Sequence, residues 1–339
     1  MNKKRALVLC PGRGSYARPC LGSLAGIDSP SLKHFDQFRA ARKQPTITEM
    51  DSATRFSSRL HVAGENASIL TAGISLADLD QINHDLVNIV GVCGNSMGWY
   101  TALGYAKALP LIQCAQLIDT MGAYQINNVM GGQLLYPLVD AEWRIADNLQ
   151  IVRKTLSEID DLYWSIKLGG QAVLGGTEAA LKAAKDMLPP LEQGTFTFPL
   201  QLPLHSAFHT PIMANTARQA ADDLSDLNWK APEVPLIDGD GMVWRPRSSD
   251  PTAIRSYTLG RQIVAPFDFS KMLTSALGNF APDIIILPGP GSNLGSAVAQ
   301  VLIQMGWQGI RSKTDFLKRQ EQNPIVISMR WADQRALVT

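Results

Sequence analysis

A serine with the surroundings of a nucleophile lies in the stretch G-N-S-M-G, residues 94–98. An apolar run precedes it and a helix-like segment follows, so this G-x-S-x-G pattern has the strand–turn–helix context of a nucleophile elbow. A Cβ at Gly94 or Gly98 would crowd the turn and the packing of the following helix. The pattern alone is common, and Ser96 needs a base before it can attack a carbonyl carbon.

The base must be one of five histidines. His34 and His84 lie in polar, helix-like surroundings typical of the surface, and His61 lies in a predicted loop. His205 and His209 lie in "LPLHSAFHTPIM", between a predicted strand and a predicted helix, where site residues often gather. We expect His209, at the start of the helix, to be the base. For His205 we favour a hydrogen-bonded structural role.

The composition is that of an ordinary globular protein. The chain has 339 residues, of which 45% are hydrophobic and 18% charged, and its formal net charge is +1. No global field favours nucleic acid. No signal peptide and no apolar stretch of about 18 residues is present, so we expect a cytoplasmic protein.

The cysteine and histidine content does not favour a metal site. Four cysteines occur without a C-x-x-C pair, and histidine is scarce. Cys10 and Cys93 lie in strand-like apolar runs, where a small buried hydrophobic residue is expected.

The site residues need a framework of parallel strands. Unbroken apolar runs over 5–10, 87–94 and 283–287 predict buried parallel strands, each ending in a glycine-containing loop. Helical spacing predicts helices over 65–83, 97–108 and 110–125, and further helices over 210–224, 267–277 and 293–306.

The segment over residues 131–205 differs from the rest of the chain in the order and length of its predicted elements. Strands are predicted over 131–140, within 162–177 and over 194–205, with helices over 142–159 and 178–188. This β-α-β-β-α-β order describes a ferredoxin-like insert. We therefore predict an α/β catalytic domain, residues 1–127 and 206–339, interrupted by a small α+β domain, residues 128–205.

Five stretches occur in the order found in a known family. They are "ALVLCPGRGS", "GNSMG", "SAFHTPIM", "RQIVAPFDF" and "LPGPGSNL". In these the chain resembles the malonyl-CoA:acyl-carrier-protein transacylases and the acyltransferase domains of fatty-acid and polyketide synthases. The resemblance covers roughly residues 5–305. It implies an α/β-hydrolase-like large domain with a parallel sheet, a nucleophile elbow and an inserted ferredoxin-like domain.

The resemblance also implies roles for individual residues. Ser96 matches the acyl-accepting serine and His209 the catalytic histidine. Gln262 matches the glutamine whose main-chain carbonyl orients the imidazole, which agrees with the absence of an obvious aspartate for a triad. The backbone amides of Met97 and Arg13 match the donors of the oxyanion hole.

The implied reaction is a ping-pong acyl transfer. An acyl group passes from a thioester to Ser96 and then to the phosphopantetheine thiol of an acyl-carrier protein. The expected partners are an acyl-carrier protein and an acyl-CoA, with no nucleic acid and no membrane. No permanently bound cofactor is expected, because CoA or phosphopantetheine thioesters are the substrates, and we expect a monomer.

Several positions depart from the family pattern. Malonyl-type members hold the free carboxylate with an arginine, where this chain has Met121; methionine cannot pair a carboxylate and favours an uncharged acyl chain. Asn95 replaces a common histidine and Trp99 a common glutamate. Phe208 matches members that use unbranched extender acids, so Asn95, Met121 and Phe208 are the expected acyl-pocket residues.

Two more departures concern the rest of the pocket. Arg13 replaces a glutamine; it could supply a displaced charge for a carboxylate or for a CoA phosphate, or be a solvated loop arginine. In the small domain, Asn-x-Pro-x-Gln appears as K-L-G-G-Q, which keeps Gln171 alone.

Alternative functions remain open at this stage. A thioester hydrolase that clears acyl groups from carrier proteins would use the same dyad, and only the final acceptor would differ. A non-catalytic carrier-binding relative is disfavoured by the retention of Ser96, His209 and Gln262. The segment after residue 306 has no readable motif, although "PIVISMRW" (324–331) fits an added strand.

Overall fold

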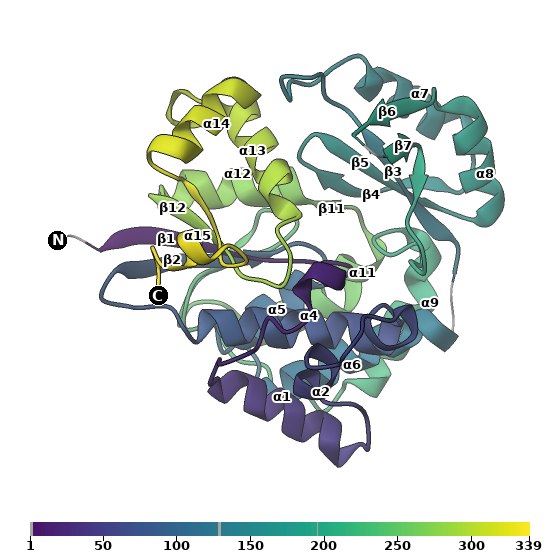
Figure 1. Cartoon of the computed structure of the whole chain (residues 1–339). Coiled ribbons are helices and arrows are strands. Elements are labelled where there is room, and N and C mark those ends of the chain that lie inside the picture. Colours follow the sequence, from purple (N-terminus) through teal and green to yellow (C-terminus); the bar gives the residue numbers. More distant parts are fainter. Residues whose placement is uncertain (1–2, 128–129, 195) are drawn as a thin grey trace.

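The large domain is built on a six-stranded sheet. The computed structural model describes residues 3–127, 130–194 and 196–339 (Figure 1). The strand order is β10-β9-β2-β1-β12-β13, parallel except for β10. The bounds are β1 (Lys4–Cys10), β2 (Val87–Gly94), β9 (Leu236–Ile237), β10 (Val243–Trp244), β12 (Ile284–Leu287) and β13 (Val326–Ser328). The three predicted apolar runs therefore form β2, β1 and β12 at its centre.

Both faces of this sheet are buried, as unbroken apolar strands predict. Along β1, Ala6 and Val8 face one core and Leu7 and Leu9 face the other. Helices cover the two faces (Figure 1). One side carries α4 (Gly64–Leu79), α5 (Gly98–Tyr105) and α6 (Leu111–Asn127); the other carries α12 (Phe269–Phe280) and α13 (Leu294–Met305).

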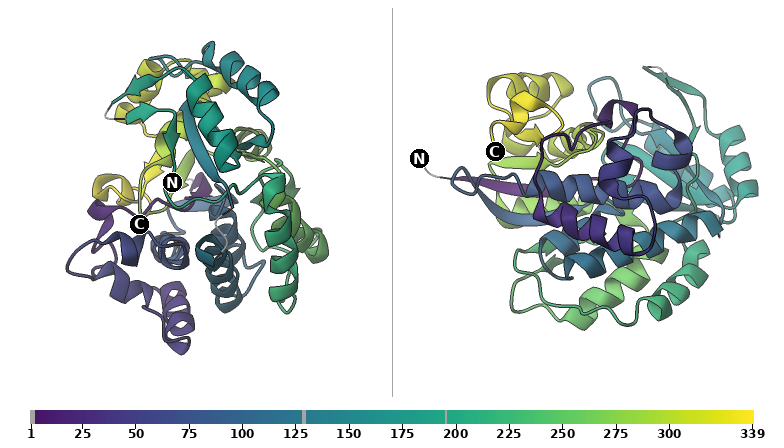
Figure 2. Two further views of the ribbon diagram at one scale, coloured as in Figure 1. Left: turned by 90° about the vertical axis from the view of Figure 1, so that its right-hand side faces the viewer. Right: turned by 60° about the horizontal axis from the view of Figure 1, so that its bottom comes forward.

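The insert has its own antiparallel sheet and lies to one side of the large sheet (Figure 2). Its strands are β3 (Gly132–Pro137), β4 (Leu162–Leu168), β5 (Gln171–Gly176) and β8 (Leu200–Gln201), and its helices are α7 (Asn148–Glu158) and α8 (Glu178–Met187). The order β4-β5-β3-β8 is that of the predicted ferredoxin-like unit. A strand from the large domain, β11 (Phe267–Asp268), adds to β4 and joins the two domains.

Two predicted elements of the insert differ in the structure. The strand predicted over 194–205 is split into β7 (Phe196–Phe198) and β8, because a proline at 199 cannot donate to a sheet. The helix predicted from residue 142 begins only at Asn148. Asp140 accepts the amides of Glu142 and Arg144 at 2.9 Å each, and this turn competes with the helix.

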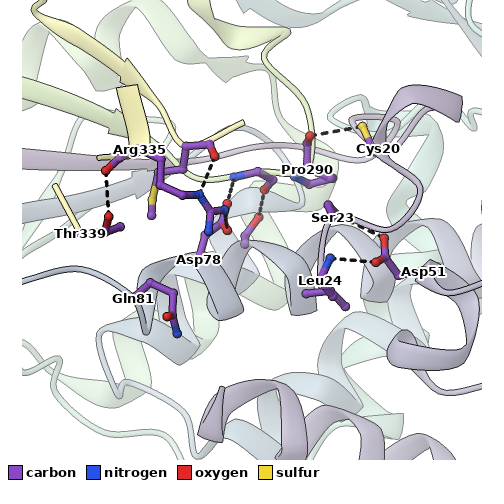
Figure 3. A network of polar contacts seen from close by, with 12 residues as sticks. Cys20, Ser23, Leu24, Asp51, Asp78, Gln81, Pro290, Arg335 and Thr339 are labelled. Atoms are coloured by element: carbon purple, nitrogen blue, oxygen red, sulfur yellow. Dashed lines mark hydrogen bonds and ion pairs between the residues drawn. The ribbon is translucent and has the colours of Figure 1, made fainter. Parts of the chain in front are cut away.

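The C-terminal segment completes the large domain. After α14 (Lys313–Gln322), β13 confirms the strand expected within 324–331 and pairs with β12. The short helix α15 (Ala332–Arg335) then places Arg335 on the buried carboxylate of Asp78 in α4. Asp78 also accepts the Gly289 amide at 2.6 Å, so the tail is fastened to the loop after β12 (Figure 3).

Within the described parts of the chain, no helix is both long enough and apolar enough to cross a bilayer.

Candidate active site

The elbow between β2 and α5 holds Ser96 in a left-handed conformation, with φ of +53°. A non-glycine residue adopts such a backbone only where the surroundings impose it. A Cβ on Gly94 would lie 2.1 Å from the main chain of Gly98, and one on Gly98 would lie 2.3 Å from the Cys10 carbonyl oxygen. The tight turn of the elbow therefore requires Gly94, and the close approach of α5 to the end of β1 requires Gly98.

Ser96 and His209 form a hydrogen-bonded pair although 113 residues separate them. The Ser96 Oγ lies 2.7 Å from His209 Nε2, and His209 Nδ1 lies 2.6 Å from the Gln262 carbonyl oxygen. Because a carbonyl only accepts, Nδ1 carries the proton and Nε2 is free to accept from the serine. Burial lowers the pKa of His209 to about 4, and the hydrogen bond to the Gln262 carbonyl partly opposes this effect by raising the pKa. The imidazole is therefore neutral at pH 7.

The main chain around His209 is fixed by both domains. His209 has φ of +61°, and its amide donates to the Ile263 carbonyl at 2.8 Å. In the insert, the Ser165 hydroxyl donates to the Phe208 carbonyl at 2.8 Å, and Gln133 donates to Ser165 at 2.7 Å. The insert thus supports the main chain next to His209, and no local sequence pattern indicates Gln133 or Ser165.

The Gln262 carbonyl is available to His209 for a reason that can be read in the sequence. Gln262 begins the one-turn helix α11 (Gln262–Val264), directly after a π-helical turn, Tyr257–Arg261. In a continuing helix its carbonyl would accept the amide four residues on, but that residue is Pro266, which has none. Ala265 is extended, with φ −119° and ψ 152°, as expected before proline.

The Gln262 side chain ties this carbonyl to the elbow. Its Nε2 donates to the Ser96 carbonyl at 3.1 Å, and its Oε1 accepts from the Tyr100 hydroxyl at 2.9 Å. Gln262 and Tyr100 are both buried. One side chain therefore links the elbow to the residue whose carbonyl holds His209, and Tyr100 is a site residue that the sequence did not indicate.

The two expected oxyanion donors both line the cavity at Ser96. Met97 precedes α5, where the first amides of a helix lack partners within it. Among the described residues, no hydrogen bond has the Met97 amide as its donor. The Arg13 guanidinium donates to the Leu204 carbonyl at 2.8 Å, and burial lowers its pKa to about 10. The role of the two amides stays a prediction.

The cavity at Ser96 has a volume of about 550 Å³, within the usual range of ligand pockets. The expected pocket residues Asn95, Met121 and Phe208 all line it, and so does Gln171. Trp99 is not among the lining residues. Its side chain is fully buried, and its indole N–H donates to the Thr258 hydroxyl at 2.9 Å.

The other histidines have different positions. His34 and His84 are exposed, as predicted. His61 is not in a loop but in the short helix α3 (Ser58–His61), where it is buried. His205 lines the cavity; its Nδ1 lies 2.8 Å from the Pro203 carbonyl, and burial followed by the charge of Arg13 lowers its pKa to about 4.

The cysteines are buried and unbridged. Burial raises the pKa of Cys93 well above its usual value, which agrees with its predicted role as a small hydrophobic residue. It does not compete with Ser96 as a nucleophile.

Comparison with known proteins places this fold. No protein-family model and no curated protein matches the sequence. Among solved structures, malonyl-CoA:acyl carrier protein transacylase from Xanthomonas oryzae matches with a TM-score of 0.73 and 19% identity, over 99% of this chain and 98% of that one. Acyl-carrier-protein S-malonyltransferase from Burkholderia pseudomallei matches with 0.75 and 18%, over 98% and 99%.

A third match has a carrier protein bound. It is a malonyl-transacylase in complex with a type II PKS acyl-carrier protein, at a TM-score of 0.73 and 15% identity over 98% of both chains. At these identities the likeness establishes the fold. The chain has the two-domain fold of the malonyl-CoA:acyl-carrier-protein transacylases over nearly its whole length, which confirms the fold expected from the resemblance.

Proposed function

We propose that this protein is an acyltransferase that carries an acyl group on Ser96, from an acyl thioester to the phosphopantetheine thiol of an acyl-carrier protein. The observation that carries the proposal is the 2.7 Å contact between the Ser96 hydroxyl and a neutral, buried His209. The fold matches proteins named as malonyltransferases, one of them bound to a carrier protein, which supports the choice of acceptor.

In the first half-reaction Ser96 Oγ attacks the thioester carbonyl carbon while His209 Nε2 takes its proton. The Gln262 carbonyl holds the imidazolium through Nδ1. The tetrahedral oxyanion is placed on the amides of Met97 and Arg13, in the position where such donors stabilise developing charge. Collapse breaks the C–S bond, and the thiol leaves with the proton from His209.

In the second half-reaction a carrier thiol enters the emptied site. His209 Nε2 takes the thiol proton as sulfur attacks the acyl-Ser96 ester. The new tetrahedral intermediate collapses by breaking the bond to Ser96 Oγ, which recovers its proton from His209. One catalytic base therefore serves both steps, and the enzyme returns to its starting state.

The acyl group is proposed to be uncharged. Met121 is 4% exposed and lines the cavity where malonyl-type enzymes carry an arginine. A malonyl carboxylate left unpaired there would cost on the order of 2–5 kcal/mol. The nearby Arg39 is no substitute, because its buried guanidinium already binds Asp119 at 2.8 Å and Asn66 at 2.5 Å.

The proposal is tested by incubating the protein with a panel of acyl-CoAs, with and without a holo acyl-carrier protein. Intact mass and free acid are followed in parallel. We expect an acyl adduct that is absent in Ser96→Ala, present in the exposed-serine control Ser157→Ala, and passed to the carrier. Fast release of free acid without transfer would assign a hydrolase instead, and no adduct from any thioester would overturn both enzyme functions.

The assignment of the acyl pocket predicts a gain of activity. Met121→Arg supplies the missing cation, so malonyl loading should rise at least about tenfold relative to the unchanged protein. Met242→Arg, which adds the same charge at a 57% exposed position, should leave malonyl loading unchanged. Malonyl-selective loading of the unchanged protein would contradict the assignment and make Arg13 the candidate carboxylate-binding residue.

A further inference from the structure

The cavity extends beyond the groups that the proposed chemistry uses. It reaches three stacked rings, those of Tyr16, Phe56 and His61, which we call the aromatic wall. The ring centroids are 5.6 Å apart for Tyr16 and His61 and 4.9 Å apart for Phe56 and His61, with planes within 13° of parallel. None of these residues has a place in the transfer of protons or in the oxyanion hole.

The polar atoms of the aromatic wall are bound away from the cavity. The Tyr16 hydroxyl donates to Asp51 at 2.8 Å. His61 Nε2 lies 2.9 Å from the Met50 carbonyl, and its Nδ1 accepts the Ser57 amide at 3.0 Å. With these groups satisfied in the helices behind, the rings offer carbon surfaces to the cavity. An uncharged hydrocarbon ligand fits such a surface, because a polar ligand would leave its own hydrogen bonds unmade.

The lining next to the aromatic rings is mostly apolar, with Ser68 beside Ala67 as its polar member. Val62, Ala67 and Met121 line the same cavity. Helices α4 and α6 approach closely here, since a Cβ on Gly122 would lie 2.6 Å from the Gly64 carbonyl oxygen. Ala67 is 4% exposed and one turn after Gly64, so its small side chain leaves room that a larger one would occupy.

These walls are held by a buried ion pair. Arg39, whose side chain is 1% exposed, binds Asp119 in α6 and both Asn66 and the Glu65 carbonyl in α4. Asn66 precedes Ala67, and Asp119 lies two residues before Met121. The arrangement fixes the spacing of the two helices, so the space between them is preformed.

Exposure gives the direction in which a substrate lies. Ala67 and His61 are buried, whereas the exposed lining residues are Gly14, Ala17, Arg18, Pro203 and Asn293. The thiol arm of CoA or of a carrier protein must reach solvent. It therefore occupies the exposed end, and the acyl tail occupies the buried end.

We infer that the space bounded by the aromatic wall, Val62, Ala67 and Met121 is an acyl-chain site for an unbranched, uncharged chain of medium length. This rests on the proposed function, because the chain must be attached to Ser96. Phe208, beside His209 and also lining the cavity, restricts branching next to the carbonyl. The proposed acyl group thus differs from a malonyl group in two respects: it has an apolar tail, and it lacks the carboxylate charge.

The test measures single-turnover loading of Ser96 by intact mass, using acetyl-, butanoyl-, octanoyl- and dodecanoyl-CoA. In the unchanged protein, octanoyl loading should exceed acetyl loading at least about tenfold, since each buried methylene adds favourable contact. Ala67→Phe fills the site and should lower the octanoyl-to-acetyl ratio at least about tenfold. Val62→Phe, at a half-buried position that tolerates bulk better, should lower the same ratio if Ala67→Phe does not fold.

The matched control is Leu168→Phe, which adds the same ring to the part of the cavity lining that the insert supplies. It should leave the octanoyl-to-acetyl ratio within about twofold. Equal losses for every chain length in Ala67→Phe and Val62→Phe would overturn the inference and assign the site to the thiol arm. An unchanged ratio in both variants would also overturn it. Failure of the proposed function would look different, because no thioester would then load the unchanged protein.

Discussion

The proposed catalytic residues Ser96, His209 and Gln262 and the proposed acyl-chain site line one cavity but are built from different parts of the chain. Ser96, His209 and Gln262 depend on main-chain features: two left-handed residues and a carbonyl left free by Pro266. The acyl-chain site depends on side chains, with Met121 and Ala67 among them. We therefore expect side-chain changes in the proposed acyl-chain site to alter the acyl preference while leaving the geometry of Ser96 and His209 intact.

The largest effect is expected from a substitution that displaces the main chain of the elbow. Gly98→Ala places a Cβ 2.3 Å from the Cys10 carbonyl oxygen. We expect it to lower the free energy of unfolding by about 3 kcal/mol or more, measured by urea denaturation, and to abolish acyl loading. Gly278→Ala is the control, since nothing lies within 4 Å of its added Cβ in α12; it should raise stability by about 0.5–1 kcal/mol. If Gly98→Ala had the stability of the wild-type protein, the close approach of α5 to the Cys10 carbonyl would not require a glycine at this position.

The pH dependence of loading should be the same for every acyl chain, because burial of the side chain lowers the pKa of His209. His209 accepts the Ser96 proton only when neutral, so the loading rate should stay level from pH 8 to 6 and fall about tenfold per pH unit below about 4. Stability should also fall as the pH drops from 6.5 towards 4, where the unfolded chain is protonated before the buried imidazole. The profile is measured by single-turnover loading with acetyl- and octanoyl-CoA.

His205 provides the control for this profile, since burial also lowers its pKa to about 4. In His205→Gln the inflection in the loading rate should persist. An inflection near pH 6.5, or one that disappears with His205, would contradict the assignment of His209 as the buried base.

The smallest effect is expected from a substitution that engages the Gln262 carbonyl, which orients His209. Pro266→Ala restores an amide four residues after Gln262, and this amide competes with His209 Nδ1 for the carbonyl. Loading should slow by about threefold to tenfold, the worth of one hydrogen bond, with the octanoyl-to-acetyl ratio unchanged. Pro251→Ala, at the first turn of α10 (Pro251–Ser256), is the control and should not slow loading. A change in chain-length preference would show that the two regions are not independent.

Local patterns predicted much of the fold. The three apolar runs became the central parallel strands, and the order of elements in the insert gave its ferredoxin-like sheet. Short elements were less predictable. The split of β7 and β8 and the late start of α7 depend on a proline and on an aspartate turn within a few residues. Strand β11 has only two residues and exists because β4 lies beside it.

Local sequence is sufficient to explain the main-chain geometry of the site. The glycines of the elbow and Pro266 act through local sterics and a missing donor, and such effects need no distant partner. The two histidines of "LPLHSAFH" could be ranked from their positions, but only the tertiary structure brings Ser96 Oγ to His209 Nε2.

Only the tertiary structure shows which residues support the site and where the proposed acyl chain would lie. Tyr100, Gln133 and Ser165 act through bonds to residues between 32 and 162 positions away, for which no local pattern exists. The aromatic wall assembles from segments that share no periodicity, and its apolar character follows from where Tyr16 and His61 direct their polar atoms. Hydrogen-bond partners of this kind are chosen by packing, so the sequence could indicate an uncharged acyl group but not the site that would hold it.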